Sequence, residues 1–533
     1  MTGAELLVEA LRGHGVKTLF SLSGNQILSI YDATLGRDVS IIHTRHEAAA
    51  VHMADGWGRL TETPGVALVT AGPGHLNAVS ALYSAYMAES PLVFLSGHAP
   101  RSQRGKGAFQ EIDQVGAARP VVKAAWVAES SDGLGDDIAR AFAIAVSGRP
   151  GPVHISLPGD LLEATVADPR EEPAPLRLDE ARAPDASLRR IVDVLADAKR
   201  PLILLGPAMA RPRRRAIVDR FCEVTGIPAL AMESPRGIND PALHAASASL
   251  PEADVVLLLG KALDYSVRFG QPPAFSPNAR LLRIDVDVSS SERFAISAAA
   301  DPAAAIQDLT TAARGRSWQR SAWADEVRSA RAAWPAEWTS LSRRDSPPIH
   351  PLRVCAALQP LLEKGALLVA DGGEFGQWAQ AGLEAQTRMI NGLSGSIGSA
   401  IPLALAAKVA EPQRTVLAVL GDGTFGFHAM EMDTAVRYRL PILTIVGNDA
   451  RWNAEHQLQR QHYGDARTVG CELLPTRYDE VVTAMGGYGE LVERAENLAP
   501  ALGRALDSGK PACLNVLIDG VAAPTYRTGA GSH

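Results

Sequence analysis

The segment Gly421-Asp422-Gly423-Thr424, together with Asn448-Asp449 further along, constrains the fold more than any other feature of this sequence. An apolar run over residues 415–420 leads into the first motif, and a second apolar run over 441–446 ends at the second. Both runs predict buried parallel strands, and residues 427–438 between them predict the connecting helix. Because both strands of a right-handed βαβ unit end at the same edge of the sheet, Asp422 and Asp449 should converge there.

Two convergent oxygen ligands suit a hard divalent cation that also holds a phosphate. Gly421 and Gly423 would let the backbone approach a bound diphosphate closely, since glycine carries no Cβ. Gly-Asp-Gly is also ordinary turn chemistry, so it is the position between two strands that favours a binding site. The residues leave open whether Asp449 or Asn448 supplies the second metal ligand.

The composition describes a globular, acidic protein. The length of 533 residues predicts about three domains, and 46% hydrophobic with 21% charged residues excludes a disordered chain. A formal charge of −7, with no long block of lysine and arginine, argues against a nucleic-acid partner. The densest basic run, residues 211–215, is either a solvated helix start or a contact for an anion or nucleotide.

The cysteines and the apolar runs indicate a cytoplasmic protein. The four cysteines are scattered and form no paired motif, which fits a reducing compartment. No signal peptide is visible, and no apolar run reaches the roughly 18 residues that a membrane span needs. We therefore expect no membrane association.

Alternating strand and helix patterns predict an α/β chain with three doubly wound parallel-sheet domains. The first domain is predicted over residues 1–165, and a linker rich in proline and charge follows over 166–187. The central domain is predicted over 188–345 and the third over 346–518. The Gly/Ala-rich segment 519–533 is either a mobile tail or a lid over a substrate.

A second group of motifs lies far from the first. Glu47, within Arg45-His46-Glu47-Ala48, follows a predicted strand at the start of an Ala-rich helix, where a glutamate often only complements the helix dipole. The next strand leads into Thr70-Ala71-Gly72-Pro73-Gly74, a glycine loop that opens on the same sheet edge. Open α/β sheets bind ligands at this edge, so the neighbourhood favours a functional Glu47.

Together these motifs resemble those of the thiamine diphosphate (ThDP)-dependent decarboxylases and carboligases, in their acetolactate synthase-like branch. The chain also resembles benzaldehyde lyase and the 2-hydroxyacyl-CoA and oxalyl-CoA lyases. The resemblance implies a pyrimidine-binding, a central and a diphosphate-binding domain, in that order. It implies that Glu47 hydrogen-bonds N1′ of the cofactor's aminopyrimidine and so promotes proton removal from the thiazolium C2. The family usually has Asn where this chain has Asp449.

The same resemblance implies the cofactor contacts. The main-chain carbonyl of Arg451 would join Asp422 and Asp449 as a ligand of Mg²⁺. Gly395 would offer a backbone contact to the ring amine, and Ile397 would wedge the cofactor into its bent shape. The implied cofactor-binding residues are Glu47, Gly373, Glu374, Gly395, Ile397, Gly421, Gly423 and Thr424.

Further residues are implied to face the substrate. Phe109 and Gln110, in a segment that resembles the family's AFQE motif, would line the catalytic side of the thiazolium. His75 is either a proton shuttle, as in some relatives, or a hydrogen-bond partner at a helix start. The candidate substrate contacts are Asn25, Gln26, Trp452, Glu455 and His456.

The implied function is a ThDP- and Mg²⁺-dependent lyase or carboligase that breaks or forms a C–C bond beside a carbonyl, acting on a 2-oxo acid or a 2-hydroxy ketone. An alternative is a 2-hydroxyacyl-CoA or oxalyl-CoA lyase, because residues 260–265 and 268–270 loosely resemble a nucleotide-binding region. ADP or another nucleotide could then bind the central domain, whereas the pattern for FAD is not evident. A non-catalytic ThDP-binding regulatory protein is a further alternative, against which the presence of Glu47 argues.

The family's active site forms between two chains, with Glu47 of one chain reaching the cofactor held by the other. The resemblance therefore implies an obligate homodimer or a homotetramer built as a dimer of dimers.

Overall fold

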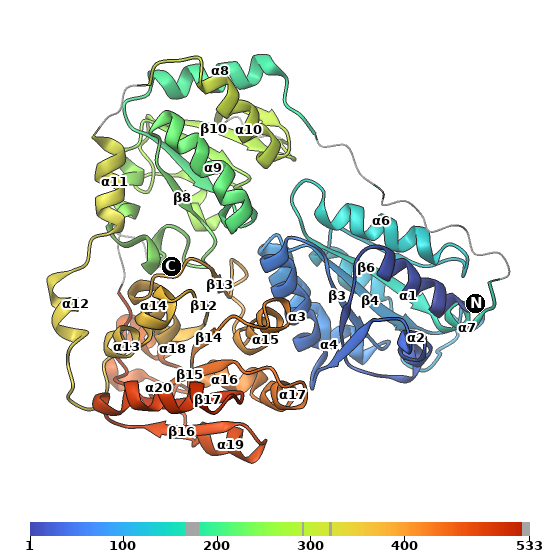
Figure 1. Cartoon of the computed structure of the whole chain (residues 1–533). Coiled ribbons are helices and arrows are strands. Elements are labelled where there is room, and N and C mark those ends of the chain that lie inside the picture. Colours follow the sequence, from blue (N-terminus) through green and yellow to red (C-terminus); the bar gives the residue numbers. More distant parts are fainter. Residues whose placement is uncertain (167–175, 177–180, 290–292, 319–321, 525–533) are drawn as a thin grey trace.

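Three parallel sheets, each flanked by helices, make up the computed structural model of the chain (Figure 1). The structure describes residues 1–166, 176, 181–289, 293–318 and 322–524. The sheets confirm the predicted α/β class with three domains. Most of the predicted linker 166–187 and the end of the segment 519–533 lie outside the described residues, and the predicted domain boundaries stay predictions.

The first sheet has the strand order β2-β1-β3-β4-β6-β5, and all its strands are parallel. Its inner strands are buried on both faces, as the apolar runs of the sequence predict. The strands are β1 (Thr18–Ser21), β2 (Ser40–His43), β3 (Gly65–Val69), β4 (Leu92–His98), β5 (Ala124–Val127) and β6 (Pro152–Pro158). The helices are α1 (Gly3–Gly13), α2 (Leu28–Thr34), α3 (Glu47–Thr61), α4 (Pro73–Met87), α5 (Gln114–Ala118), α6 (Leu134–Val146) and α7 (Gly159–Glu163).

The central sheet has the order β11-β10-β9-β7-β8. Its strands are β7 (Pro201–Leu205), β8 (Ala229–Ala231), β9 (Val255–Leu259), β10 (Arg280–Asp285) and β11 (Phe294–Ala299). Its helices are α8 (Asp185–Asp197), α9 (Pro212–Thr225), α10 (Pro302–Ala313) and α11 (Trp323–Arg331), and α12 (Ala336–Leu341) leads on to the third domain.

The third sheet has the order β13-β12-β14-β15-β17-β16, which repeats the pattern of the first sheet. Its strands are β12 (Leu367–Asp371), β13 (Arg388–Ile390), β14 (Val416–Gly421), β15 (Leu443–Asn448), β16 (Tyr488–Val492) and β17 (Ala512–Leu517). Its helices are α13 (Pro351–Glu363), α14 (Gly373–Gly382), α15 (Ala400–Ala410), α16 (Asp422–His428), α17 (Glu431–Arg437), α18 (Asn453–Tyr463), α19 (Tyr478–Ala484) and α20 (Leu498–Asp507).

The helix predicted over 427–438 is wrong in its bounds. A helix begins directly at Asp422, and a break divides the stretch into α16 and α17. The predicted glycine turn is therefore the first turn of a helix, whose first backbone N–H groups have no partner within the helix.

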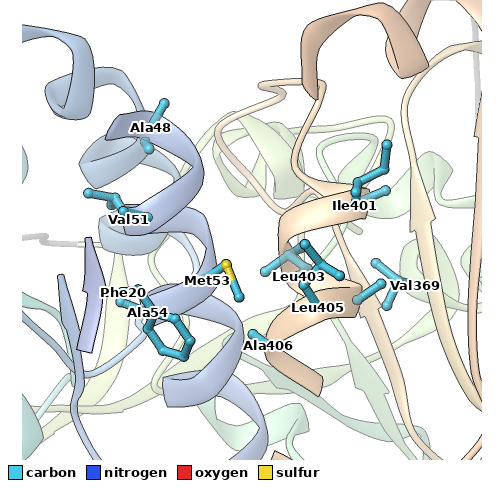
Figure 2. Packing of buried hydrophobic residues seen from close by; sticks show 14 of the residues in the cluster. Phe20, Ala48, Val51, Met53, Ala54, Val369, Ile401, Leu403, Leu405 and Ala406 are labelled. Atoms are coloured by element: carbon cyan, nitrogen blue, oxygen red, sulfur yellow. The ribbon is translucent and has the colours of Figure 1, made fainter. Parts of the chain in front are cut away.

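Helices α3 and α15 join the first and third domains, and Figure 2 shows their packing. Every residue of α15 except its last two is buried, because the helix lies between its own sheet and α3. Small side chains allow the close approach: a Cβ on Gly56 would lie 2.9 Å from Cβ of Ala406. A single apolar cluster therefore runs through both domains and includes Phe20 of the first and Val369 of the third. Within the described ranges, every helix is too short or too polar to cross a membrane.

Candidate active site

A small cavity of about 90 Å³ lies at the carboxyl edge of the third sheet, among the loops that follow β12, β14 and β15; we call it the GDG cavity. All its lining residues belong to the third domain. It brings together most of the residues predicted there, but neither Gly395 nor His456. The predicted residues that line it are Gly373, Glu374, Ile397, Gly421, Asp422, Gly423, Thr424, Asp449, Arg451, Trp452 and Glu455.

Asp422 is the first residue of α16 and is buried, with its Oδ2 lacking a hydrogen-bond partner among the described residues. Burial raises the pKa of this carboxyl to about 6, against the lowering effect of nearby backbone N–H groups such as that of Gly423. A carboxylate with an unpaired oxygen at a helix N-terminus is suited to hold a cation.

Asp449 lies in the same cavity, and burial and the Asp422 carboxylate raise its pKa to about 7. The side chain of Asn448 forms hydrogen bonds away from the cavity. Its Nδ2 donates to the carbonyl of Thr476 at 3.1 Å and to Oδ1 of Asn515 at 3.0 Å. Of the two alternatives that the sequence left open, it is therefore Asp449 whose side chain shares the cavity with Asp422.

These donors fit a hard cation. Two carboxylates of like charge converge here. Among the described residues, no backbone N–H of another helix or strand donates to the carbonyl of Arg451. Carboxylate and carbonyl oxygens are the ligands that Mg²⁺ prefers. Within the described part of the chain, no group of three or more His, Cys, Asp or Glu could hold a metal unaided. A phosphate-bearing cofactor would supply the missing oxygens.

The glycines of the cavity differ in what they allow. A Cβ on Gly421 would meet nothing within 4 Å, as a close approach of a ligand requires. A Cβ on Gly423 would lie 2.6 Å from the ring of Trp452, so this glycine makes room for the tryptophan. A Cβ on Gly372, whose φ is +47°, would likewise lie 2.8 Å from the side chain of Ile397. Trp452 and Ile397 therefore each pack against the backbone of a glycine.

Glu374 holds the described start of the C-terminal segment. Its Oε2 accepts the N–H of Ala523 at 2.8 Å, and burial raises the pKa of this carboxyl. Gln457 donates to the carbonyl of Gly520 at 2.9 Å, so residues 519–524 pack along the rim of the GDG cavity. Because the Glu374 carboxyl is bonded to Ala523, the predicted diphosphate contact of this residue would come from its backbone. Whether the rest of the segment is a tail or a lid lies outside the described residues.

Glu47 begins helix α3 at the equivalent edge of the first sheet. Its Oε2 accepts a hydrogen bond from Nδ2 of Asn77 at 3.0 Å, and its Oε1 lies 3.4 Å from where a Cβ on Gly74 would be. Asn77 is not among the residues predicted from the sequence. Its signal is its position four residues after Pro73, in the first turns of the helix that follows the glycine loop.

Two further predicted residues of this edge, Gln26 and Gln110, are joined by hydrogen bonds. Nε2 of Gln26 donates to Oε1 of Gln110 at 2.9 Å, and the hydroxyl of Thr70 donates to Oε1 of Gln26. Gln110 has a left-handed φ of +59°, and a Cβ on Gly72 would lie 2.6 Å from its carbonyl. Phe109 is 70% exposed, and Asn25 is exposed beside Gln26.

His75 is not brought to this edge. It is fully buried, with Nδ1 3.2 Å from Oγ of Ser96 and its ring against Phe94 and His154. Burial lowers the pKa of His75 to about 4, so it is neutral at pH 7. Its role as a proton shuttle stays a prediction, and this placement favours the alternative of a structural hydrogen-bond partner.

The two edges are separate within one chain. The start of α3 meets the end of α16 and the start of its neighbour α17: Arg45 donates its N–H to Oε1 of Glu431 at 2.9 Å, and the rings of His46 and His428 lie 6.0 Å apart. The GDG cavity lies at the opposite, N-terminal end of α16. Glu47 therefore does not line the cavity of its own chain.

Two cations at or beside the region predicted for a nucleotide are paired with carboxylates. Lys261 is buried and its Nζ lies 2.6 Å from Oδ2 of Asp264, while Arg149 forms a two-pronged contact with Asp285. Nothing in this arrangement favours a nucleotide in the central domain, which stays a prediction.

Comparison with known proteins assigns the three domains. Residues 1–117 match the N-terminal TPP binding domain of thiamine pyrophosphate enzymes, residues 188–309 match their central domain, and residues 371–516 match their C-terminal TPP binding domain. The matches follow the order that the resemblance implied.

Similar proteins cover almost the whole chain. An acetolactate synthase large subunit from Mycobacterium tuberculosis is 37% identical over 97% of this chain and 96% of its own length. A 2-hydroxyacyl-CoA lyase 2 from Homo sapiens is 31% identical over 97% and 90%, and a catabolic acetolactate synthase from Raoultella terrigena is 31% identical over 97% and 95%. The chain therefore belongs to the thiamine pyrophosphate enzyme family and is a ThDP-dependent enzyme that forms or cleaves carbon–carbon bonds.

Proposed function

We propose that this enzyme uses ThDP and Mg²⁺ to break a 2-oxo acid or 2-hydroxy ketone beside its carbonyl, and to pass the acyl unit to a second carbonyl compound. The observation that supports the proposal is that Asp422 and Asp449 share the GDG cavity, while Glu47 lies at the equivalent edge of the first sheet and does not line that cavity. When bound, ThDP supplies the nucleophilic carbon that adds to the substrate carbonyl. The similarity to acetolactate synthases supports this substrate class.

The chain's own residues divide the work between two edges. Asp422, Asp449 and the carbonyl of Arg451 would hold the cation, and the start of α16 would face the diphosphate. Glu47, aligned by Asn77, would hold or share a proton at the aminopyrimidine N1′. The amides of Gln26 and Gln110 would bind the carbonyl or carboxylate of the substrate.

A second copy of the chain would complete the site. The GDG cavity of about 90 Å³ is well below the roughly 300–1,000 Å³ of small-molecule sites, so it holds only part of such a cofactor. Large apolar side chains are exposed on α4 beside Glu47, namely Leu76, Tyr83 and Tyr86, and Phe427 and Met430 are exposed on and just beyond α16. Exposed apolar groups of this kind mark an interface, here with the homodimer partner. A homotetramer and a cytoplasmic location stay predictions.

Glu47→Ala tests the catalytic assignment. We expect loss of hydrogen exchange at the thiazolium C2 and loss of turnover by roughly 100-fold or more, with ThDP still bound. The measurements are NMR-detected exchange of the bound cofactor and CO2 release from 2-oxo acids. Glu163→Ala, an exposed change on the same domain, is the control. Unchanged exchange in Glu47→Ala would refute the role of Glu47.

Mixing two inactive variants tests the shared site. Chains with Glu47→Ala and chains with Asp422→Ala each lose activity, but a hybrid dimer has one intact site. Random pairing should restore about a quarter of the wild-type sites, because half the dimers are hybrids and each has one working site of two. No recovery after co-refolding, with hybrids demonstrated by differential tags, would mean that each site forms within one chain.

A 2-hydroxyacyl-CoA lyase is the second candidate function. The chain is similar to 2-hydroxyacyl-CoA lyases. In the described part of the C-terminal segment, Gly520 and Ala523 contact Gln457 and Glu374 beside the GDG cavity. This function predicts that CoA raises the melting temperature of the holoenzyme and that 2-hydroxyacyl-CoA is cleaved to an aldehyde. Absence of both effects at millimolar CoA would exclude it.

A further inference from the structure

A second cavity, of about 340 Å³, lies where the three domains meet, and we call it the arginine cavity. It is bordered by the end of α3, the start of α9 and strand β13 with its flanking loops (Figure 1). None of its lining residues lines the GDG cavity. Its arginines are Arg59, Arg211, Arg215, Arg331 and Arg388.

Three of these arginines have carboxylate partners. Arg59 pairs with Asp55 at 2.5 Å, Arg215 with Asp219 at 2.7 Å, and Arg388 with Glu233 at 2.7 Å. Arg211 and Arg331 form no ion pair with any described residue. The cavity therefore keeps an excess of positive charge after its internal pairs are counted.

Arg211 is the most informative of the five. Its side chain is only 8% exposed, and its Nη2 donates to two neutral groups, the carbonyls of Ala88 at 2.6 Å and Glu89 at 2.8 Å. Burial, together with the charges of Arg59 and Arg214, lowers the pKa of Arg211 to about 10, against the opposing effect of the Glu89 and Asp55 carboxylates, neither of which forms an ion pair with it. Burying a cation without a carboxylate partner is costly, and an anion in the cavity would offset that cost.

The start of helix α9 adds to the positive charge of the arginine cavity. Arg211 is the N-cap residue, no side chain caps the helix, and Pro212 at its first position lines the cavity. The helix has 14 residues, so its N-terminus carries an appreciable partial positive charge. Free N–H groups at such an end bind oxyanions.

We propose that the arginine cavity binds a small multivalent oxyanion, a phosphate-bearing metabolite, as an effector separate from the substrate. The planar donors of arginine match the oxygens of phosphate in pairs, and the volume is at the lower end of the range for small-molecule sites. The same charge would also accept a polycarboxylate, which the test distinguishes.

The site has a direct route to both halves of the active site. Nη1 of Arg59 donates to the carbonyl of Ile390 at 2.5 Å, and Gly392, which follows, lines the cavity and begins the loop that carries Gly395 and Ile397. Arg59 stands near the end of α3, the helix that Glu47 begins. A bound anion would tie these segments together, so we expect it to stabilise the holoenzyme and to alter its turnover.

The experiment titrates inorganic phosphate, and separately citrate, into the enzyme saturated with ThDP and Mg²⁺. Ionic strength and free Mg²⁺ are held constant, and binding is followed by melting temperature and calorimetry. We expect a saturable rise in melting temperature. Arg211→Gln should weaken binding by about 10-fold or more, because a buried charged donor is lost. Arg213→Gln removes the same charge from an exposed position on the same helix and should leave binding unchanged.

A second variant covers the case in which Arg211→Gln does not fold. Arg331 is exposed and forms no ion pair with the described residues, so Arg331→Gln should fold and still weaken binding several-fold. Saturation by phosphate alone assigns a phosphate ligand, and saturation by citrate alone overturns that assignment. The site itself is refuted if neither anion saturates, or if Arg213→Gln weakens binding as much as the cavity variants. Basal activity without added anion is expected in every variant, which separates this test from that of the active site.

Discussion

The first and third domains have the same strand order, yet their equivalent edges carry different chemistry. After β3, the loop of residues 70–74 places Pro73 at the start of α4 and contains no carboxylate. After β14, the equivalent loop places Asp422 at the start of α16. One fold thus serves two binding tasks, and the loops at the carboxyl edge decide which task each copy performs.

The carboxylates of the two edges also differ in their surroundings. Glu47 is aligned by the neutral amide of Asn77, which suits a group that holds a proton at a ring nitrogen. Asp422 and Asp449 face each other, and the pKa of each is raised, to about 6 and about 7. A pair of carboxylates brought together in this way is stabilised by a cation or by a shared proton, whereas a single aligned carboxyl needs neither.

The largest expected effect comes from removing the acid of the third domain. Asp422→Ala should weaken ThDP binding at fixed Mg²⁺ by roughly 100-fold or more, since a cation loses a charged ligand. Fluorescence titration of the cofactor measures this, with the exposed Asp465→Asn as control. Retained affinity would show that the two edges do not differ as described.

A smaller effect is expected at the first domain's edge. Gln110→Ala leaves the amide of Gln26 without its partner, and we expect the KM for the carbonyl substrate to rise about 10-fold. The affinity for ThDP should not change. A change confined to cofactor affinity would place Gln110 with the cofactor and not with the substrate.

Asp449→Asn should act more gently, because an amide oxygen is still a ligand. We expect activity within about 10-fold of wild type, with weaker dependence on Mg²⁺. The apoenzyme should melt at a higher temperature, since a like-charge contact with Asp422 is removed. Complete loss of cofactor binding would mean that the acid has another role.

The smallest effect on activity is expected at His75, whose effect is on stability. The folded pKa of about 4 lies below the ordinary 6.5, so the folded state binds fewer protons than the unfolded state between these values. Stability is therefore lost as the pH falls through 6.5 towards 4, by about 2 kcal/mol at pH 5. His75→Gln should show a smaller drop in melting temperature from pH 7 to pH 5. An equal drop would contradict the buried, neutral state of His75.

Much of the fold could be predicted because the inner strands are continuous apolar runs. The predicted strands over 415–420 and 441–446 correspond to β14 and β15. The edge strands β5, β8 and β13 are short. Edge strands are only partly buried and need no long apolar run, so their sequence carries a weak signal.

The site was predicted unevenly for a related reason. Residues at the end of a buried strand, such as Asp422 and Asp449, are located by the strand that precedes them. Asn77 and Asn453 were missed, because each acts through a helix turn that faces a neighbouring carboxylate and no motif marks it. His75 follows a glycine loop like a site residue, but its side chain turns into the domain.

The sequence by itself determined the family, the three parallel sheets and the convergence of two carboxylates, because periodic burial and chain topology place strand ends without reference to side-chain packing. Only the tertiary structure decided that Asp449 and not Asn448 turns into the cavity, and that Glu47 lies away from the cavity of its own chain. It also brought Arg211 from a basic run into a buried cavity between three domains. Those outcomes depend on which neighbours compete for each polar group, and the neighbours are distant in the sequence.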